Sequence, residues 1–475
     1  MNFCKTSIIL SFAAMSASMM TAEPVVSNVT LAQDQSTRKV TITYSLSQEP
    51  GIVTVDILTN GVSIGDANLT HFAGDVNRVV QTGNARTIHW YPEEAWPSNR
   101  TDAATALVTA WATNAPPNYM VVDLIDGAMT YYTSTNCLPD GGLANDVYRT
   151  DRMVFRKIPA RGVTWRMGSP TNELGRTKTD GSCDETPHLV TLTKDYWFGI
   201  YPVTMGQHKR FTDSNSDYAP SYCFFTNIAS HLTRPMQGIG MKSVRSGNTV
   251  SWPDSGHAVA SGTYIAKFRA KAGGLPFDLP TEAQWEYVCR GGHFGHVLGD
   301  GSELTQANVF AMAWTKNNSG NAVQPIGEKK PNSWDFHDMT GTLHEWCRDF
   351  ATSGNGYTSS ASETDPKGPM TNAEGKRVRR GSSFGGSWSD CNPWYRLLSG
   401  VQGTTANNVT GYRLVVETDE GSAADPALGV QRGFADSAVG LLETRPAATL
   451  AGVRANRPNS VIDTATPLAF ILVVR

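Results

Sequence analysis

The sequence has no excess of basic residues. Its 475 residues include 40 lysines and arginines against 43 aspartates and glutamates, which gives a net charge of −3. The densest basic run, from Lys376 to Arg380, is short and is typical of a strand with a solvated edge. Because nucleic-acid binding requires a clustered basic surface, we expect no nucleic-acid partner.

Long apolar runs are missing beyond the first 22 residues. A membrane-spanning helix needs about 20 consecutive apolar residues, and the longest later candidate, 468–474, has only the length of a strand. The N-terminus combines Lys5, an apolar stretch over 8–20 and small residues before Glu23, the pattern of a secretory signal. We expect residues 1–22 to be a cleaved signal peptide and the mature protein to be secreted, periplasmic or extracellular, without a transmembrane segment.

Cysteine is scarce, with seven residues in the whole chain. Cys4 falls within the expected signal peptide. The other six are Cys137, Cys183, Cys223, Cys289, Cys347 and Cys391. In an exported protein such cysteines can form disulfides, and the sequence alone leaves about fifteen connectivities open.

The length of the chain predicts two or three domains. Apolar residues alternate through residues 23–113, as at Val40, Ile42 and Tyr44, and turn signals separate the short runs. This pattern predicts an all-β sandwich, similar to immunoglobulin or fibronectin modules, with a spacing or adhesion role. Residues 114–150 contain Pro and Gly clusters and are predicted to form a connector that packs partly on the next domain.

The segment 151–417 carries a series of short motifs. They are Ile158-Pro-Ala-Arg-Gly-Val-Thr-Trp-Arg-Met-Gly-Ser-Pro170, Leu279-Pro-Thr-Glu-Ala-Gln-Trp-Glu-Tyr-Val-Cys-Arg-Gly-Gly292, Asp338-Met-Thr-Gly-Thr-Leu-His-Glu-Trp-Cys347, Arg380-Gly-Ser-Ser-Phe384 and Gly411-Tyr-Arg-Leu-Val-Val416. In this order the series resembles the formylglycine-generating enzyme, or sulfatase-modifying factor, family. The resemblance implies an α+β, loop-rich, C-type-lectin-like domain over 151–417. The tail, 418–475, matches nothing in the family pattern.

The same resemblance implies a copper site, of which this chain keeps half. Active family members carry two cysteines after a Gly-Gly-Ser-aromatic motif, bind copper with them, and oxidise a sulfatase cysteine to formylglycine with O2. Aligning Ser383 and Phe384 with that motif places Cys391 on the second cysteine and Gly386 on the first. Cys391 and Ser383 are therefore the candidate catalytic residues. Copper(I) favours soft thiolate ligands, and a low-coordinate site needs at least two.

Structural calcium is the second metal that the resemblance implies. A family motif Gly-Asn-x-x-Glu is matched by Gly341, Leu343 and Glu345, although Thr342 replaces the asparagine. A second family site, an asparagine followed by a backbone carbonyl, is matched by Asn308 and Val309. Side-chain and carbonyl oxygens of this kind are what a hard cation prefers.

Two other interpretations concern the segment around Cys391. Gly381-Ser-Ser-Phe-Gly385 matches the Gly-x-Ser-x-Gly pattern of hydrolases, but the residues after Gly385 cannot begin a regular helix, which argues against a nucleophile elbow. Cys347 could approach Cys391 as a substitute ligand, although two neighbouring cysteines in an exported protein favour a disulfide.

These observations leave two hypotheses. In the favoured one, the chain is an exported family member that has lost the copper cysteine pair and serves as a binding or assembly module for a protein or glycan ligand. In the alternative, it is an active formylglycine-generating oxidase that acts on a sulfatase-type Cys-x-Pro-x-Arg substrate. A scaffold alone does not decide between them.

Overall fold

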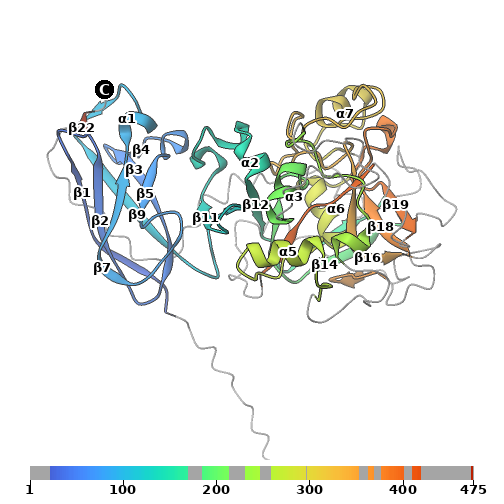
Figure 1. The fold of residues 1–475 in the computed structure, drawn as a ribbon, viewed down its shortest axis with the longest axis horizontal. Coiled ribbons are helices and arrows are strands. Elements are labelled where there is room, and N and C mark those ends of the chain that lie inside the picture. The colour runs from blue at the N-terminus through green and yellow to red at the C-terminus, as the bar shows by residue number, and fades with distance from the viewer. Residues whose placement is uncertain are drawn as a thin grey trace, which may run out of the picture.

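The computed structural model describes residues 22–169, 185–212, 231–245, 258–295, 297–351, 362–368, 376–400, 409–418 and 472–473. All but the last residue of the expected signal peptide, together with Cys183, Cys223 and nearly all of the tail, lies outside the described residues. Strands outnumber helices along this part of the chain, and Figure 1 shows them in two parts joined by a central segment. None of the described helices is long and apolar enough to span a membrane.

The N-terminal part consists mainly of two antiparallel sheets. One has the order β1-β2-β7-β5, and in the other β3 pairs with β4, β6 and β9. The strands are β1 (Val25–Gln33), β2 (Val40–Ser47), β3 (Gly51–Thr59), β4 (Val62–Ser63), β5 (Phe72–Gly74), β6 (Val79–Val80), β7 (Gly83–Trp90) and β9 (Ala104–Ala112).

The alternation in the sequence determines which side chains of these sheets are buried. In β2, Val40, Ile42 and Tyr44 are inside, and the residues between them are more exposed. Val53 and Ile57 of β3 belong to the same hydrophobic cluster as these residues. Burial of side chains from both sheets in one cluster explains how the sheets are held together.

The segment predicted as a connector contributes two strands to the following domain. β10 (Tyr119–Asp123) and β11 (Met129–Tyr132) belong to a five-stranded sheet of order β11-β10-β12-β15-β21. The other strands are β12 (Arg152–Ile158), β15 (Tyr196–Gly199) and β21 (Val415–Glu417). Because β21 lies more than 200 residues after β15, this sheet brings the two ends of the second part together.

Within the described residues, two smaller sheets and five further helices complete the second part, which also contains the short helix α2 (Val147–Thr150). One sheet has the order β13-β14-β17 and the other β19-β18-β16-β20. The strands are β13 (Val163–Met167), β14 (His188–Leu192), β16 (His344–Ala351), β17 (Ser362–Thr364), β18 (Lys376–Arg380), β19 (Arg396–Gly400) and β20 (Thr410–Gly411). The helices are α3 (Met205–Thr212), α4 (Met241–Val244), α5 (Tyr264–Lys271), α6 (Glu282–Arg290) and α7 (Gln306–Met312).

Short elements fill the connections. They are η1 (Asp66–Asn68), α1 (Pro92–Ala95), β8 (Arg100–Thr101), η2 (Thr135–Cys137), η3 (Gly142–Ala144), α2 (Val147–Thr150), η5 (Trp388–Asp390) and β22 (Leu472–Val473). β22, from the end of the tail, pairs antiparallel with β8.

Helix α6 begins with a capping box. The Thr281 hydroxyl accepts the N–H of Gln284 at 3.1 Å, and the Gln284 side chain accepts the N–H of Thr281 at 2.9 Å. Gly291 ends the helix in the left-handed conformation with a φ of 56°. Every residue of α6 is buried, so this helix passes through the interior of the domain rather than covering one face of it.

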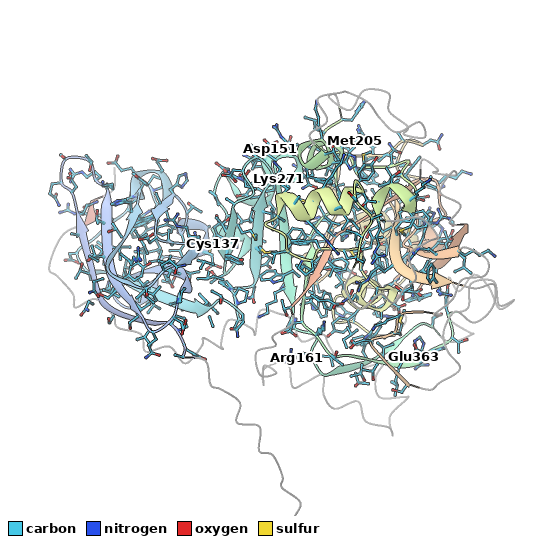
Figure 2. The ribbon with its side chains drawn as sticks, turned by 60° about the horizontal axis from the view of Figure 1, so that its bottom comes forward. Cys137, Asp151, Arg161, Met205, Lys271 and Glu363 are labelled. Atoms are coloured by element: carbon cyan, nitrogen blue, oxygen red, sulfur yellow. The ribbon has the colours of Figure 1, made fainter. Side chains whose placement is uncertain are left out.

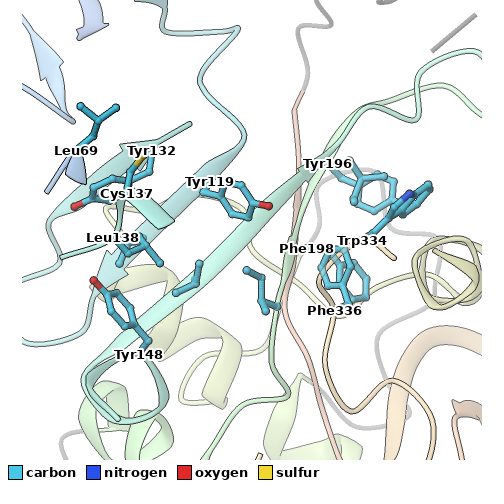
Figure 3. Close-up of a cluster of buried hydrophobic side chains, with 14 of the residues drawn as sticks. Leu69, Tyr119, Tyr132, Cys137, Leu138, Tyr148, Tyr196, Phe198, Trp334 and Phe336 are labelled. Carbon is cyan, nitrogen blue, oxygen red and sulfur yellow. The ribbon is translucent and has the colours of Figure 1, made fainter. Parts of the chain in front are cut away.

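A continuous hydrophobic cluster links the two parts of the molecule. Leu69 lies near Tyr132 and Cys137 in Figure 3, and all three belong to the cluster that extends from the N-terminal sheets into the second part. The N–H of Tyr131 donates to the carbonyl of Asn77 at 2.7 Å across the same boundary. Figure 2 shows Cys137 at this boundary.

Candidate functional site

The Gly381 motif forms a turn between β18 and η5. Gly381 has a φ of 69°, and a Cβ there would lie 2.8 Å from the Met339 carbonyl oxygen, so only glycine fits. Its own carbonyl oxygen lies 2.6 Å from His344 Nδ1. The N–H of Phe384 donates to the carbonyl of Thr342 at 3.0 Å. The fold thus brings two motifs that are about 40 residues apart in the sequence into direct contact.

Cys391 directly follows η5 in the chain and is fully buried. It packs in a small cluster with Leu298, Val309, Met312 and Trp394. The thiol donates to the carbonyl of Ser387, with the sulfur 3.6 Å from the oxygen. Burial raises the pKa of Cys391 to about 12, and the nearby Ser382 hydroxyl opposes this increase. The thiol is therefore protonated at neutral pH, whereas a nucleophile or copper ligand must be a thiolate.

Gly386 offers no ligand at the position of the first copper cysteine. A Cβ placed on Gly386 would overlap the Oγ of Ser382 and would lie 3.2 Å from the Ser383 carbonyl oxygen. Ser382 is itself buried. Because one protonated thiol and one hydroxyl occupy this place, the residues present do not fit a two-thiolate copper(I) site.

Ser383, the predicted catalytic serine, has a role in the turn. It is buried, and its carbonyl oxygen accepts the N–H of Gly386 at 2.8 Å. The serine whose hydroxyl influences Cys391 is instead its neighbour, Ser382. Sequence reasoning missed Ser382, although it stands where the family motif has its second glycine.

The expected disulfide between Cys347 and Cys391 is absent, and that expectation was wrong. Neither thiol forms a disulfide, and neither do those of Cys137 and Cys289, the other cysteines of the described residues. Cys347 lies on β16 and belongs to the large cluster, whereas Cys391 belongs to the small one. Burial raises the pKa of Cys347 well above its usual value. Cys347 therefore packs as a small apolar residue.

Glu345, the carboxylate of the predicted calcium motif, is occupied within the protein. Its Oε1 accepts from Arg413 Nη2 at 2.9 Å, and its Oε2 accepts from Trp285 Nε1 at 2.7 Å. Thr342, which replaces the motif's asparagine, donates from its hydroxyl to Asp338 at 3.1 Å. Gly341 adopts a φ of 79° and lies against the carbonyl of Trp314. Leu343 is buried in a cluster with Val323 and Phe384.

The second predicted calcium pair lies on α7. The Asn308 side-chain nitrogen donates to the carbonyl of Glu303 at 2.9 Å, and the carbonyl of Val309 accepts the N–H of Ala313 at 2.8 Å. Glu345, the Asn308 amide nitrogen and the Val309 carbonyl therefore have protein partners. Both oxygens of Glu345, the only carboxylate among these residues, are held by Arg413 and Trp285, so neither set presents a free carboxylate to a calcium ion. Structural calcium at these positions stays a prediction.

A buried charge network positions the motif that contains Gly381. Arg380 Nε donates to Glu282 Oε1 at 2.7 Å, and its Nη2 donates to Glu286 Oε2 at 2.8 Å. Arg396 Nε also donates to Glu282, at 2.6 Å. Burial opposes ionisation of Glu282, but Arg380 and Arg396 lower its pKa below the usual value.

This network corrects the interpretation of the basic run at 376–380. Arg377 and Arg380 are fully buried, so the run is not a solvated strand edge. The partners of Arg380 are on α6, more than 90 residues earlier, where Glu282 and Glu286 are four residues apart and share one helix face. That spacing is the sequence signal that could have suggested the network.

Comparison with known proteins places the chain in a family. Residues 158–418 match the family described as "Sulfatase-modifying factor enzyme 1-like domain". The chain is 31% identical over 189 residues to the formylglycine-generating enzyme of Streptomyces coelicolor, which covers 37% of this chain and 54% of the relative. It is also 31% identical over 181 residues to that of Mus musculus, covering 35% and 43%.

A solved structure is similar over the same region. Treponema denticola variable protein 1 aligns with a TM-score of 0.39 and 21% identity, covering 56% of this chain and 95% of that one. The chain spans about half the length, or less, of the curated relatives named above. Because the family match extends over more than half of its residues, the chain belongs to the sulfatase-modifying factor, or formylglycine-generating enzyme, family.

Proposed function

We propose that this protein is an exported member of the family that has lost copper oxidase chemistry and acts as a binding or assembly module. The observation that carries the proposal is Gly386, which supplies no ligand where the family places its first copper cysteine. Removing one of two thiolates removes a strong soft donor, and glycine puts nothing in its place.

The state of the remaining thiol supports the same conclusion. Cys391 is buried, donates to a backbone carbonyl and has a pKa of about 12. Nucleophilic attack and oxidation by a thiol proceed through the thiolate, so burial and a pKa of about 12 oppose both reactions at Cys391 in the metal-free protein. Cys391 is better explained as a packing residue beside Trp394.

The scaffold around the altered position is intact, which favours a retained binding role over general decay. Arg380 keeps its charge-assisted hydrogen bonds to α6, and Arg413 keeps its ion pair with Glu345. Breaking such buried pairs costs several kcal/mol, about 3–5 when one partner is removed. We infer a protein or glycan ligand, with the N-terminal sheets serving as an immunoglobulin- or fibronectin-like sandwich that spaces the domain.

The decisive experiment is co-expression with a peptide that carries the Cys-x-Pro-x-Arg sequence. Mass spectrometry of the peptide should show an unchanged cysteine. The relative from Streptomyces coelicolor, expressed in parallel, is the positive control and should form the aldehyde. Formation of the aldehyde by this protein, together with its loss in Cys391→Ser, would establish the oxidase alternative and reject the proposal.

A further inference from the structure

We infer that the Ser382 hydroxyl occupies the space that a side chain at position 386 would need. We call Ser382 and Gly386 together the steric unit. Because it blocks the position of the first copper cysteine, Gly386→Cys alone cannot rebuild the ligand pair. This inference rests on the proposed loss of copper chemistry. It identifies Ser382 as the residue that would prevent a cysteine at position 386 from restoring copper binding. It concerns two departures from the family motif, Ser382 for the second glycine of Gly-Gly-Ser-aromatic and Gly386 for the cysteine. The two positions are four residues apart in sequence and meet in the folded turn.

The contact between the two positions is direct. Among the atoms near a Cβ on Gly386, the nearest is Ser382 Oγ, at a separation that non-bonded atoms do not adopt. The next two are the carbonyl oxygen and the nitrogen of Ser383, at 3.2 and 3.5 Å. The Ser383 carbonyl oxygen is also a tight neighbour, but the Ser382 hydroxyl is much closer and is the main obstacle to a side chain at position 386.

Backbone conformation is not the obstacle at Gly386. Gly381 needs glycine because its φ is positive, but Gly386 does not have a φ in the left-handed range. A side chain at position 386 would therefore be acceptable to the main chain. The restriction comes from packing, and most of it should be relieved when the Ser382 hydroxyl is removed.

The Ser382 side chain has little freedom to move aside. Its residue is 1% exposed, and its Oγ makes no hydrogen bond of ordinary geometry with the described residues, although it lies near enough to Cys391 to lower the pKa of that thiol. A hydroxyl displaced from this place must enter a close-packed interior, where added volume is destabilising. Ser382→Gly would instead free a space that opens toward Cys391.

A double-mutant cycle tests the steric unit without reference to catalysis. The proteins are the unmodified chain, Ser382→Gly, Gly386→Ala and the combined variant. Gly386→Ala alone should lower the Tm by about 4 °C or more, because the added methyl group must displace the buried Ser382 hydroxyl into close-packed surroundings. The same change should have little effect when Ser382→Gly is present, giving a clear coupling between the sites.

Gly385→Ala is the matched control for this cycle. Gly385 is exposed, its φ is not left-handed, and the nearest atom to a Cβ there, Ser383 Oγ, is 4.0 Å away. Alanine at position 385 should leave the Tm nearly unchanged. If Gly386→Ala is as harmless as Gly385→Ala, the Ser382 hydroxyl yields freely and the inference is wrong.

Copper(I) binding supplies the second readout. Purified Gly386→Cys and Ser382→Gly/Gly386→Cys are titrated with copper(I) against a chromophoric chelator, with Cys391→Ser added to each as a control. The double variant should bind at least about tenfold more tightly than Gly386→Cys, and the gain should vanish without Cys391. Equal affinity of the two variants would overturn the steric unit.

The outcomes separate this inference from the proposed function. Tight copper(I) binding or aldehyde formation by the unmodified protein would reject the loss of oxidase chemistry, whatever the cycle shows. Absence of coupling between positions 382 and 386 would reject only the steric unit.

Discussion

Arg413 and Glu345 form a fully buried ion pair, with Arg413 Nη2 2.9 Å from Glu345 Oε1. The pair joins the Gly-Tyr-Arg motif near the end of the domain to the Glu-Trp-Cys motif on β16. Arg413 also donates to the carbonyls of Gly199, the last residue of β15, and Ile200. One guanidinium therefore ties three distant segments together, and the motif arginine has a structural role.

Removing one member of this pair should be strongly destabilising. Glu345→Gln leaves the Arg413 charge buried without its carboxylate, and the expected loss is about 3–5 kcal/mol in the free energy of unfolding. Urea unfolding followed by fluorescence measures this loss. Arg78→Ala, which removes an exposed ion pair with Asp75, is the control and should cost at most about 1 kcal/mol. Similar losses in the two variants would contradict the role assigned to Arg413.

The features that sequence reasoning predicted are those with local causes. Alternation at Val40, Ile42 and Tyr44 indicated a strand there, which is β2. The order of motifs indicated the family, which the comparison confirms.

The features that sequence reasoning missed depend on contacts between distant residues. Pro and Gly clusters flank β10 and β11 and favour a connector there, and only pairing with β12 defines these segments as sheet strands. The burial of Arg380 was missed because its partners, Glu282 and Glu286, are far away in sequence. The serine at position 382 affects which side chains fit at position 386, and the two positions come into contact only in the folded turn.

Cys391 should be unreactive in the native protein. Its thiol is buried and has a pKa of about 12, so almost none is present as thiolate at pH 8. Native protein is treated with iodoacetamide, quenched, unfolded and labelled with a second alkylating reagent, and the two labels are then distinguished by mass spectrometry. Cys391 should carry only the second label. Rapid labelling of Cys391 in the native state would show an accessible thiolate and would count against the proposed function.

Leu69 should couple the N-terminal sheets to the rest of the protein. It is buried with Tyr132 and Cys137 (Figure 3), and η1, which precedes it, lies against η2. Leu69→Ala in the full chain should lower the free energy of unfolding by about 2–5 kcal/mol. In a fragment of residues 23–113, the same substitution should cost less because its partners beyond residue 113 are gone. The free energy of unfolding is measured with urea for both proteins. Equal losses would show that contacts between Leu69 and residues beyond 113 do not contribute to stability.

Asp349 should make stability decrease as the pH rises. It is fully buried, and burial, reinforced by the negative charge of Glu282, raises its pKa from 3.8 to about 7. Between these values the folded protein retains a proton that the unfolded chain has released, so increasing pH favours unfolding. The contribution of this group is therefore fully present below pH 3.8 and is lost progressively as the pH rises to about 7.

Asp349→Asn isolates this effect. Asp349 Oδ2 accepts the N–H of Glu282 at 2.7 Å, and the amide oxygen of asparagine can accept the same hydrogen bond without a buried charge. The variant should gain stability relative to the unmodified protein as the pH rises from 5 to 8, as measured by urea unfolding at a series of pH values. Asp102→Asn, at an exposed position, is the control and should show no such gain. A difference between Asp349→Asn and the unmodified protein that stays constant over this range would mean that Asp349 does not titrate there.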